Sequence, residues 1–251
     1  MTSGARGPAW LGIGAQRSGT TWFANLLLQH PSVDFGRDGR KEVHFFDRFL
    51  VQPWSNALVG HYTALFDPSR RAGDFTPSYL RCLWIPELVR KVCGRDALFI
   101  VLLRDPVERF ASAMRWYTSR PGVPPPDRRN EYLNWVRDKG NDAIWGGMYA
   151  RQLEAWTDVL PRERFVVMQY ESVRQDPQAA VDRVWRDLGL EPRPLGRVSE
   201  RSWNSTPDAQ ATDVWAQLPG LRDRLRALYA PEVEALVRTW GVDRMSWPNF
   251  A

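Results

Sequence analysis

Short apolar runs alternate along the chain with segments whose apolar residues recur at helical spacing. Residues 9–14, 97–103 and 164–170 are mostly apolar runs of the kind that forms buried strands. The run ALFIVLL at 97–103 is the strongest, and its continuous apolar character predicts a central parallel strand covered on both faces. Shorter strands are predicted at 33–35 and 72–75.

Amphipathic segments follow most of these strands. The first helix is predicted at 20–29, ending before Pro31 because the residue that precedes a proline disfavours the α region. Further helices are predicted at about 53–66, 84–93, 105–117, 131–138, 144–158, 174–187 and 218–239. Strands that alternate with helices predict an α/β fold, a three-layer α/β/α domain with a central parallel sheet. With no repeat and no break in composition, we expect one domain over residues 1–251.

The composition is that of a soluble globular protein, with 43% hydrophobic and 25% charged residues. No apolar run approaches the ~20 residues that a membrane span needs, and the N-terminus lacks the apolar stretch of a signal peptide. Cys82 and Cys93 have no metal-ligand spacing. We therefore predict a cytoplasmic protein that holds no metal and does not associate with membranes.

The basic residues are unevenly divided, with 31 Arg and 3 Lys in a chain of net charge +5. Codon usage in a GC-rich genome is one explanation of this excess of arginine. Binding of an anionic ligand is the other, because guanidinium groups bind phosphate and sulfate at two points. A pI near 9.5 permits nucleic-acid binding. The chain has no basic run and no zinc-finger spacing, so no nucleic-acid partner is predicted.

The stretch GAQRSGTTW at 14–22 nearly spells a phosphate-binding loop between the first strand and the first helix. Four residues separate Gly14 from Gly19, but Thr20 occupies the lysine position and the cation has moved to Arg17. Glycines and a helix N-terminus still make an anion site, because unpaired N–H groups point at the ligand. The alternative is a glycine turn that leads into a packed helix.

A second anion signal is LRDPVERFAS at 103–112, which runs from the strongest strand into a helix. Arg104 lies at the carboxyl end of a strand, where open α/β sheets bind ligands. Ser112 is two turns into the helix and shares a polyanion with Arg104 if the strand end and the helix flank meet. The alternative is that Arg104 pairs with Asp105 or Glu108. We expect Arg109 to be structural or solvent-facing.

Together with KEVHFFD at 41–47, these two motifs resemble the sulfotransferases that use 3′-phosphoadenosine-5′-phosphosulfate (PAPS). The loop at 14–22 looks like their 5′-phosphosulfate loop, and the segment at 103–112 looks like their 3′-phosphate motif. KEVHFFD is similar to the K/N-E-x-H-F-F-D segment of the heparan sulfate sulfotransferase branch. Further similarity to that branch lies at 76–79, 147–154 and 225–231, so the resemblance covers nearly the whole chain.

The resemblance implies transfer of a sulfuryl group from PAPS, with adenosine 3′,5′-bisphosphate (PAP) as product and no metal. Trp22 looks like the tryptophan that stacks on adenine in small-molecule sulfotransferases, with a core role as the alternative. The donor-binding residues that the resemblance implies are Arg17, Ser18, Gly19, Thr20, Thr21, Trp22, Arg104 and Ser112.

The same resemblance implies that Glu42 is the general base and Arg17 the catalytic cation. His44 would orient Glu42 or the acceptor, and Asp47 would hold His44. If the segment is extended, Glu42 and His44 share one face and Lys41 lies on the other. The alternative is a surface Lys41–Glu42 pair beside a buried His44.

Departures from the family pattern bear on the acceptor. The heparan branch usually has lysine where this chain has Arg17, and tends to have lysine where this chain has Phe75. The family's C-terminal lysine-glycine-arginine run has only Arg201-Ser-Trp-Asn204 as its counterpart here. We expect a bacterial member acting on a hydroxyl or amine of a small molecule, sugar, nucleoside or natural product. The 13 Trp and the proline-rich loop near 121–126 are candidates for lining its pocket.

Two other functions stay open. A phosphate-loop kinase or NTPase would want the loop lysine and Mg²⁺ ligands. A non-catalytic binder of nucleotides or sulfated glycans has no need of a base such as Glu42.

Overall fold

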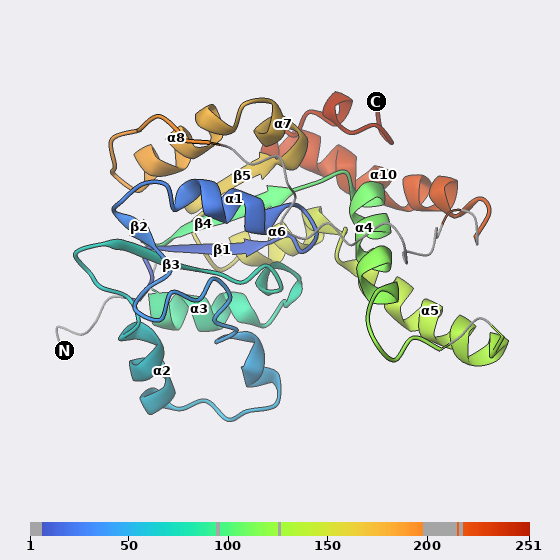
Figure 1. Cartoon of the computed structure of the whole chain (residues 1–251), viewed down its shortest axis with the longest axis horizontal. Helices are drawn as coiled ribbons and strands as arrows, with labels where there is room; N and C mark the ends of the chain where they lie inside the picture. Colours follow the sequence, from blue (N-terminus) through green and yellow to red (C-terminus); the bar gives the residue numbers. More distant parts are fainter. Residues whose placement is uncertain (1–6, 94–95, 125–126, 198–214, 216–217) are drawn as a thin grey trace.

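The computed structural model describes residues 7–93, 96–124, 127–197, 215 and 218–251 (Figure 1). These residues form one five-stranded sheet of order β2-β3-β1-β4-β5, and every neighbouring pair is parallel. The strands are β1 (Trp10–Gly14), β2 (Val33–Asp34), β3 (Arg71–Phe75), β4 (Leu98–Leu103) and β5 (Phe165–Gln169). The predicted α/β fold with a central parallel sheet is confirmed.

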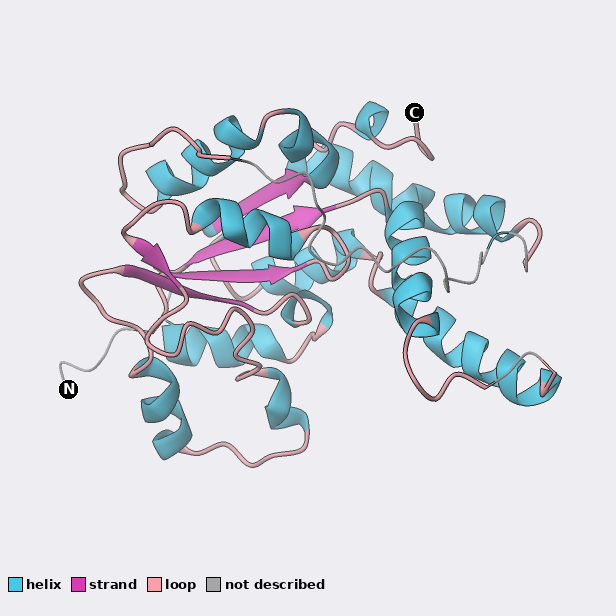
Figure 2. Ribbon diagram, in the orientation of Figure 1, coloured by secondary structure: helices cyan, strands magenta, loops and turns pink. Residues whose placement is uncertain are grey.

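Helices cover both faces of this sheet, as the ribbon in Figure 2 shows. They are α1 (Thr20–Leu27), α2 (Asn56–Thr63), α3 (Ile85–Cys93), α4 (Pro106–Thr118), α5 (Arg129–Trp145), α6 (Tyr149–Thr157), α7 (Tyr170–Gln175), α8 (Pro177–Asp187) and α10 (Leu221–Trp240). Short 3₁₀ turns lie at η1 (Asp47–Leu50), η2 (Tyr79–Arg81), η3 (Arg162–Arg164) and η5 (Arg244–Ser246). Among the described residues, no helix is both long and apolar enough to cross a membrane.

Strand β4 explains why its sequence is apolar at every position. Phe99, Val101 and Leu103 enter the core that α3, α6 and α10 cover. The residues that alternate with them, at 98, 100 and 102, enter the core beneath α1 and α8. A strand buried on both faces has no place for a polar side chain.

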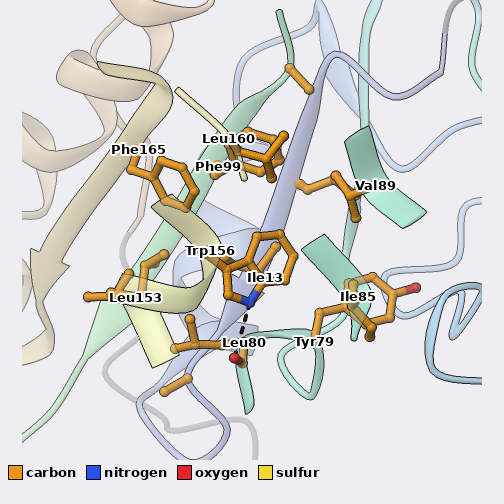
Figure 3. Close-up of a cluster of buried hydrophobic side chains, with 14 of the residues drawn as sticks. Ile13, Tyr79, Leu80, Ile85, Val89, Phe99, Leu153, Trp156, Leu160 and Phe165 are labelled. Atoms are coloured by element: carbon orange, nitrogen blue, oxygen red, sulfur yellow. Dashed lines mark hydrogen bonds between the residues drawn. The ribbon is translucent and has the colours of Figure 1, made fainter. Parts of the chain in front are cut away.

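Figure 3 shows the first of these cores, in which Trp156 of α6 lies between Ile13 of β1 and the 3₁₀ turn that follows β3. The indole Nε1 of Trp156 donates to the Leu80 carbonyl oxygen at 3.1 Å. This bond pairs a polar group that would otherwise be buried alone. It also fixes the turn after β3, which lies near the candidate site.

Two predicted helix boundaries are wrong. The predicted helices at 131–138 and 144–158 are instead α5 and α6, because the chain breaks at Gly146–Met148 and α5 runs on through Gly140. A Cβ at Gly140 would meet no atom within 4 Å, so nothing in the packing ends the helix there.

The predicted helix at 174–187 is divided between α7 and α8 at Asp176. The Asp176 side chain accepts a hydrogen bond from Ala179 N at 2.9 Å, and Pro177 occupies the first helical position. This is an ordinary helix start.

Gly12 in β1 provides a test of the packing between β1 and β3. A Cβ at this position would collide with the ring of Phe75, which is fully buried. We expect Gly12→Ala to lower the free energy of unfolding by about 1–3 kcal/mol, as overpacking of a core does. Urea denaturation followed by circular dichroism measures the change.

The matched control is Gly60→Ala on the exposed side of α2, where a Cβ would meet nothing within 4 Å. Alanine is favoured over glycine inside a helix, so this variant should be as stable as the wild type or about 0.5–1 kcal/mol more stable. Equal stability of the two variants would contradict the packing described here.

Candidate functional site

The candidate site lies at the carboxyl ends of the strands, where β1, β3 and β4 reach one edge of the sheet. The loop 15–19 follows β1, the segment 76–79 follows β3, and Arg104 follows β4. Figure 1 shows α4 standing beyond this edge. The segment 41–47 is tied to the same edge, because Phe75 N donates to the Lys41 carbonyl oxygen at 2.8 Å.

The loop after β1 has the backbone of an anion cradle. Gly19 has φ +81°, and a Cβ there would lie 2.5 Å from the Tyr170 ring, so only glycine fits without strain. The N-cap residue Gly19 has no side chain that could cap α1, and no acidic residue lies in the first turn of the helix. The N–H groups at the positive end of a helix favour a bound anion. Ser18 and Thr20 are buried at the base of this loop.

Arg17 joins this loop to α4. Its Nε donates to Ser112 Oγ at 3.3 Å. Burial and, after it, the positive charges of Arg104, Arg115, Arg109 and Arg120 together lower the pKa of Arg17 to about 10. Cations gathered around one half-buried guanidinium repel one another. A bound anion at this position would relieve that repulsion.

Arg104 is one of these cations, and its guanidinium carbon lies 5.3 Å from the centre of the Tyr170 ring. Its carbonyl oxygen accepts a hydrogen bond from the Tyr149 hydroxyl at 3.1 Å. No ion pair between Arg104 and either Asp105 or Glu108 is found within the described part of the chain. The alternative that Arg104 pairs with one of these two carboxylates is therefore not supported.

Asp105 caps α4 and also binds Asn249; the sequence predicted only the helix start at residue 105. Its Oδ1 accepts from Val107 N and Glu108 N and so caps α4. Its Oδ2 accepts from both the backbone N and the side-chain Nδ2 of Asn249, each at 2.9 Å. Asp105 thereby fixes the turn that carries Arg104 to a segment 144 residues further along the chain.

Glu171 supports the same turn from the other side. Its carboxylate accepts from Asp105 N at 3.0 Å and from the indole Nε1 of Trp247 at 2.9 Å. Burial raises the pKa of this carboxyl, against the hydrogen bonds that lower it. Sequence reasoning missed Glu171, Trp247 and Asn249, because no local pattern announces a contact between distant segments.

The segment 41–47 brings three predicted residues into contact. His44 Nε2 lies 3.4 Å from Glu42 Oε2, and His44 Nδ1 lies 2.6 Å from Asp47 Oδ2. The Ser78 hydroxyl donates to the same Asp47 oxygen at 3.0 Å. The side chains of Glu42 and His44 are 39% and 50% exposed, so both are open to an incoming molecule. The alternative of a buried His44 is wrong.

The segment is not the extended strand that placed Lys41 on the opposite face. His44 has φ +53°, a left-handed backbone that is uncommon outside glycine. Burial lowers the pKa of Lys41, and its ammonium lies 2.6 Å from Glu42 Oε1. The Lys41 ammonium also lies 5.3 Å from the centre of the Phe75 ring. A cation therefore lies beside position 75, where the heparan branch tends to have a lysine.

The remaining predicted positions differ in outcome. Trp22 is half-buried in α1 and meets the Tyr170 ring edge-on, with centroids 6.1 Å apart. Arg109 is buried and donates to the Ala143 carbonyl oxygen, so its predicted structural role holds and the solvent-facing alternative does not. The stretch 201–204 lies outside the described residues. Within the described part of the chain, no group of three His, Cys, Asp or Glu could hold a metal ion.

Asp74 is a buried carboxyl that sequence reasoning passed over. Burial raises its pKa to about 6, against hydrogen bonds from Thr76, Val43 N, Tyr79 and Tyr62 that lower it. Burial also raises the pKa of both tyrosines, so they remain hydroxyl donors at neutral pH.

Comparison with known proteins gives this edge of the sheet a context. The profile of the family described as "Sulfotransferase domain" matches residues 9–206. Heparan sulfate glucosamine 3-O-sulfotransferase 3B1 of Mus musculus is 30% identical over 188 residues, which are 71% of this chain and 45% of that protein. Sulfotransferase 2A1 of Homo sapiens is 24% identical over 189 residues, which are 74% of this chain and 61% of that protein. The chain spans about half the length of the first of these curated relatives.

Solved structures show the same fold. A sulfotransferase from Alicyclobacillus acidocaldarius superposes with a TM-score of 0.70 at 23% identity, covering 96% of this chain and 98% of that one. The sulfotransferase domain from the curacin biosynthetic pathway superposes with a TM-score of 0.58 at 14% identity, covering 96% of this chain and 99% of that one.

The raised pKa of Asp74 predicts a pH dependence of stability. An acid whose pKa is higher in the folded than in the unfolded chain contributes stability below its unfolded pKa of 3.8, and this is lost as pH rises through about 6. Relative to Asp74→Asn, the wild type should lose up to about 3 kcal/mol of unfolding free energy between pH 4 and pH 7. Urea denaturation at several pH values across this range measures the free energy of unfolding. The same change of this free energy with pH in both proteins would refute the prediction.

Proposed function

Because this chain belongs to the sulfotransferase family, we propose that it moves a sulfuryl group from PAPS to a hydroxyl or amine of an acceptor. The observation that carries this proposal is the contact of Arg17 with Ser112 amid several arginines, beside the uncapped start of α1. That arrangement gathers positive charge from two motifs separated by 95 residues. It suits a ligand with anionic groups at two points.

The donor fits this arrangement. PAPS carries a phosphosulfate at its 5′ end and a separate phosphate at its 3′ position, and it supplies the sulfuryl group for transfer. The N–H groups of Gly19, Thr20 and Thr21 and the guanidinium of Arg17 are assigned to the 5′ end. Arg104 and Ser112 are assigned to the 3′-phosphate, which would give selectivity against ATP. Ser18, buried in the same loop, is also assigned to the 5′ end, and Trp22 is assigned to the adenine.

The proposed chemistry needs alignment, a base and a cation, and no covalent step on the protein. We assign the acceptor proton to Glu42, whose carboxylate is partly exposed and is held between the Lys41 ammonium and the His44 imidazole. His44 orients that carboxylate, and Asp47 fixes the imidazole through Nδ1. Arg17 stabilises the negative charge that develops on the leaving phosphate oxygen. This role falls to a guanidinium here, where the resemblance led us to expect lysine.

We propose a small molecule or saccharide as the acceptor. The family relatives include proteins named for a heparan sulfate glucosamine 3-O position and for a biosynthetic pathway. The exposed Glu42–His44 pair accepts a substrate from solvent. A natural product or a sugar with one accessible hydroxyl meets that requirement, and the cytoplasm is our proposed location for the reaction.

The donor assignment predicts a specific ligand response. PAP should raise the melting temperature of the protein in the absence of magnesium, because a ligand that binds only the folded state stabilises it. ATP, which lacks a 3′-phosphate, should do little. A thermal-shift titration with both nucleotides, with and without EDTA, measures this. Stabilisation by Mg-ATP that disappears on adding EDTA would instead favour a kinase or NTPase.

The division of roles predicts that two variants fail in different ways. Glu42→Gln keeps the shape of the side chain but removes the base, so transfer of ³⁵S from labelled PAPS should fall by about 10²–10⁴-fold with PAP affinity unchanged. Arg104→Ala should weaken PAP binding by about 10–100-fold, the loss of a charge-assisted contact. Calorimetric titration with PAP measures the affinities.

The matched control is Arg174→Ala. Arg174 also lies near the Tyr170 ring, at 5.9 Å, but it is exposed on α7 and has no assigned role. Its PAP affinity should equal that of the wild type. Full activity in Glu42→Gln, or an equal loss of affinity in the two arginine variants, would remove these assignments.

A further inference from the structure

The backbone of the base-bearing segment is held by an unusual set of acceptors. Four consecutive amides, those of residues 43–46, donate outward to side chains of the β3 region. The first donates to Asp74 Oδ1 at 3.3 Å and the second to Thr76 Oγ1 at 3.4 Å. The third and fourth both donate to the Tyr79 hydroxyl, at 2.8 and 3.4 Å. None of these acceptors is a backbone carbonyl, so side chains hold these four amides.

All of these acceptors converge on one carboxylate. The Thr76 hydroxyl donates to Asp74 Oδ1 at 2.6 Å, and the Tyr79 hydroxyl donates to Asp74 Oδ2 at 3.0 Å. Asp74 is fully buried, and it lies on β3 opposite Leu11 of the central strand. Each of the four amides is therefore connected to a single buried group, either directly or through one hydroxyl.

This connection bears on the orientation of the functional side chains. Glu42 immediately precedes the four amides, and His44 carries one of them in a left-handed backbone conformation. Such a backbone costs energy and persists only where its surroundings determine it. The rings at 45 and 46 are buried, so the core holds this backbone in addition to the hydrogen bonds.

We propose that Asp74, acting through Tyr79 and Thr76, is a positioning residue that aims Glu42 and His44 at the acceptor. The proposal rests on the proposed role of Glu42 as base. Asp74 touches neither the donor nor the acceptor. Its carboxylate accepts hydrogen bonds from the hydroxyls of Thr76 and Tyr79. Each hydroxyl therefore directs its proton at Asp74 and keeps its lone pairs for the amides of the segment.

The chain offers a matched pair of variants to test this. Tyr62 and Tyr79 are both buried, and both donate to Asp74 Oδ2, at 3.1 and 3.0 Å. Only the Tyr79 hydroxyl also accepts from the segment. The Tyr62 ring stacks on Phe45 at 4.1 Å, a contact that Tyr62→Phe retains. The two substitutions thus remove the same kind of bond to the same oxygen, and differ in whether two amides lose their acceptor.

Two measurements need no acceptor molecule. Hydrogen exchange read by mass spectrometry should show at least 10-fold faster exchange in residues 43–46 of Tyr79→Phe than in Tyr62→Phe. The chain has three histidines, so the side-chain ¹⁵N resonances of His44 can be assigned. They should move in Tyr79→Phe and stay at their wild-type positions in Tyr62→Phe.

A third measurement addresses the reaction itself, with ³⁵S-labelled PAPS and 2-naphthol, glucosamine and adenosine as probe acceptors. Tyr79→Phe should lower kcat at least 10-fold, with unchanged stabilisation by PAP, and Tyr62→Phe should keep wild-type kcat. If the wild type neither binds PAP nor turns over, the proposed function fails while exchange and resonances still report on the segment. Equal exchange and unmoved His44 resonances in both variants would overturn the positioning role, whatever the activity.

Discussion

The parallel pairing of β1 with both β3 and β4 is the constraint on which the rest of the site depends. It registers Gly12 against Phe75 on one side and Gly14 against Val101 on the other. The carboxyl ends of three strands therefore lie at the same edge of the sheet, and the turns that follow them lie close together. The glycines of β1 permit this pairing, because Phe75 occupies the space that a side chain at Gly12 would need.

The charged groups at that edge of the sheet cost the protein free energy when no ligand is bound. Arg17 is half-buried and lies close to other guanidinium groups, and burial first and then this repulsion lower its pKa. Asp74 is buried as a carboxylate that must be satisfied by hydroxyls and an amide. Strain and charge of this kind are usual at functional sites, where a ligand completes what the fold leaves unbalanced. In the proposed function these two groups have separate roles: the residues around Arg17 face the anionic donor, and Asp74 sets the position of Glu42.

Much of the fold could be predicted from the sequence, because strand burial and helix capping depend on residues that are close together in the chain. The run at 97–103 is apolar at every position since both faces of β4 are buried, and Asp105-Pro106 begins a helix for ordinary reasons of capping. The misplaced boundary near Gly140 arose because a helix tolerates a glycine that packs against nothing. The contact between His44 and Asp47 was expected from the resemblance and is present.

The supporting residues could not be predicted in the same way. Asp74 looks like a polar residue at a strand end, and only the folded chain shows that four amides depend on it. Asn249 reaches Asp105 across 144 residues, a pairing for which no local pattern exists. Sequence thus indicated the groups that would face a ligand, whereas the groups that hold them in place are set by tertiary packing.

In the proposed function, one anionic donor spans the start of α1 and the turn at Arg104. A crystal structure of the protein with PAP tests it most directly. We expect the 5′-phosphate on the N–H groups of Gly19 to Thr21 beside Arg17, and the 3′-phosphate on Arg104 and Ser112. A bisphosphate bound away from this edge, or bound with its two phosphates exchanged, would contradict it.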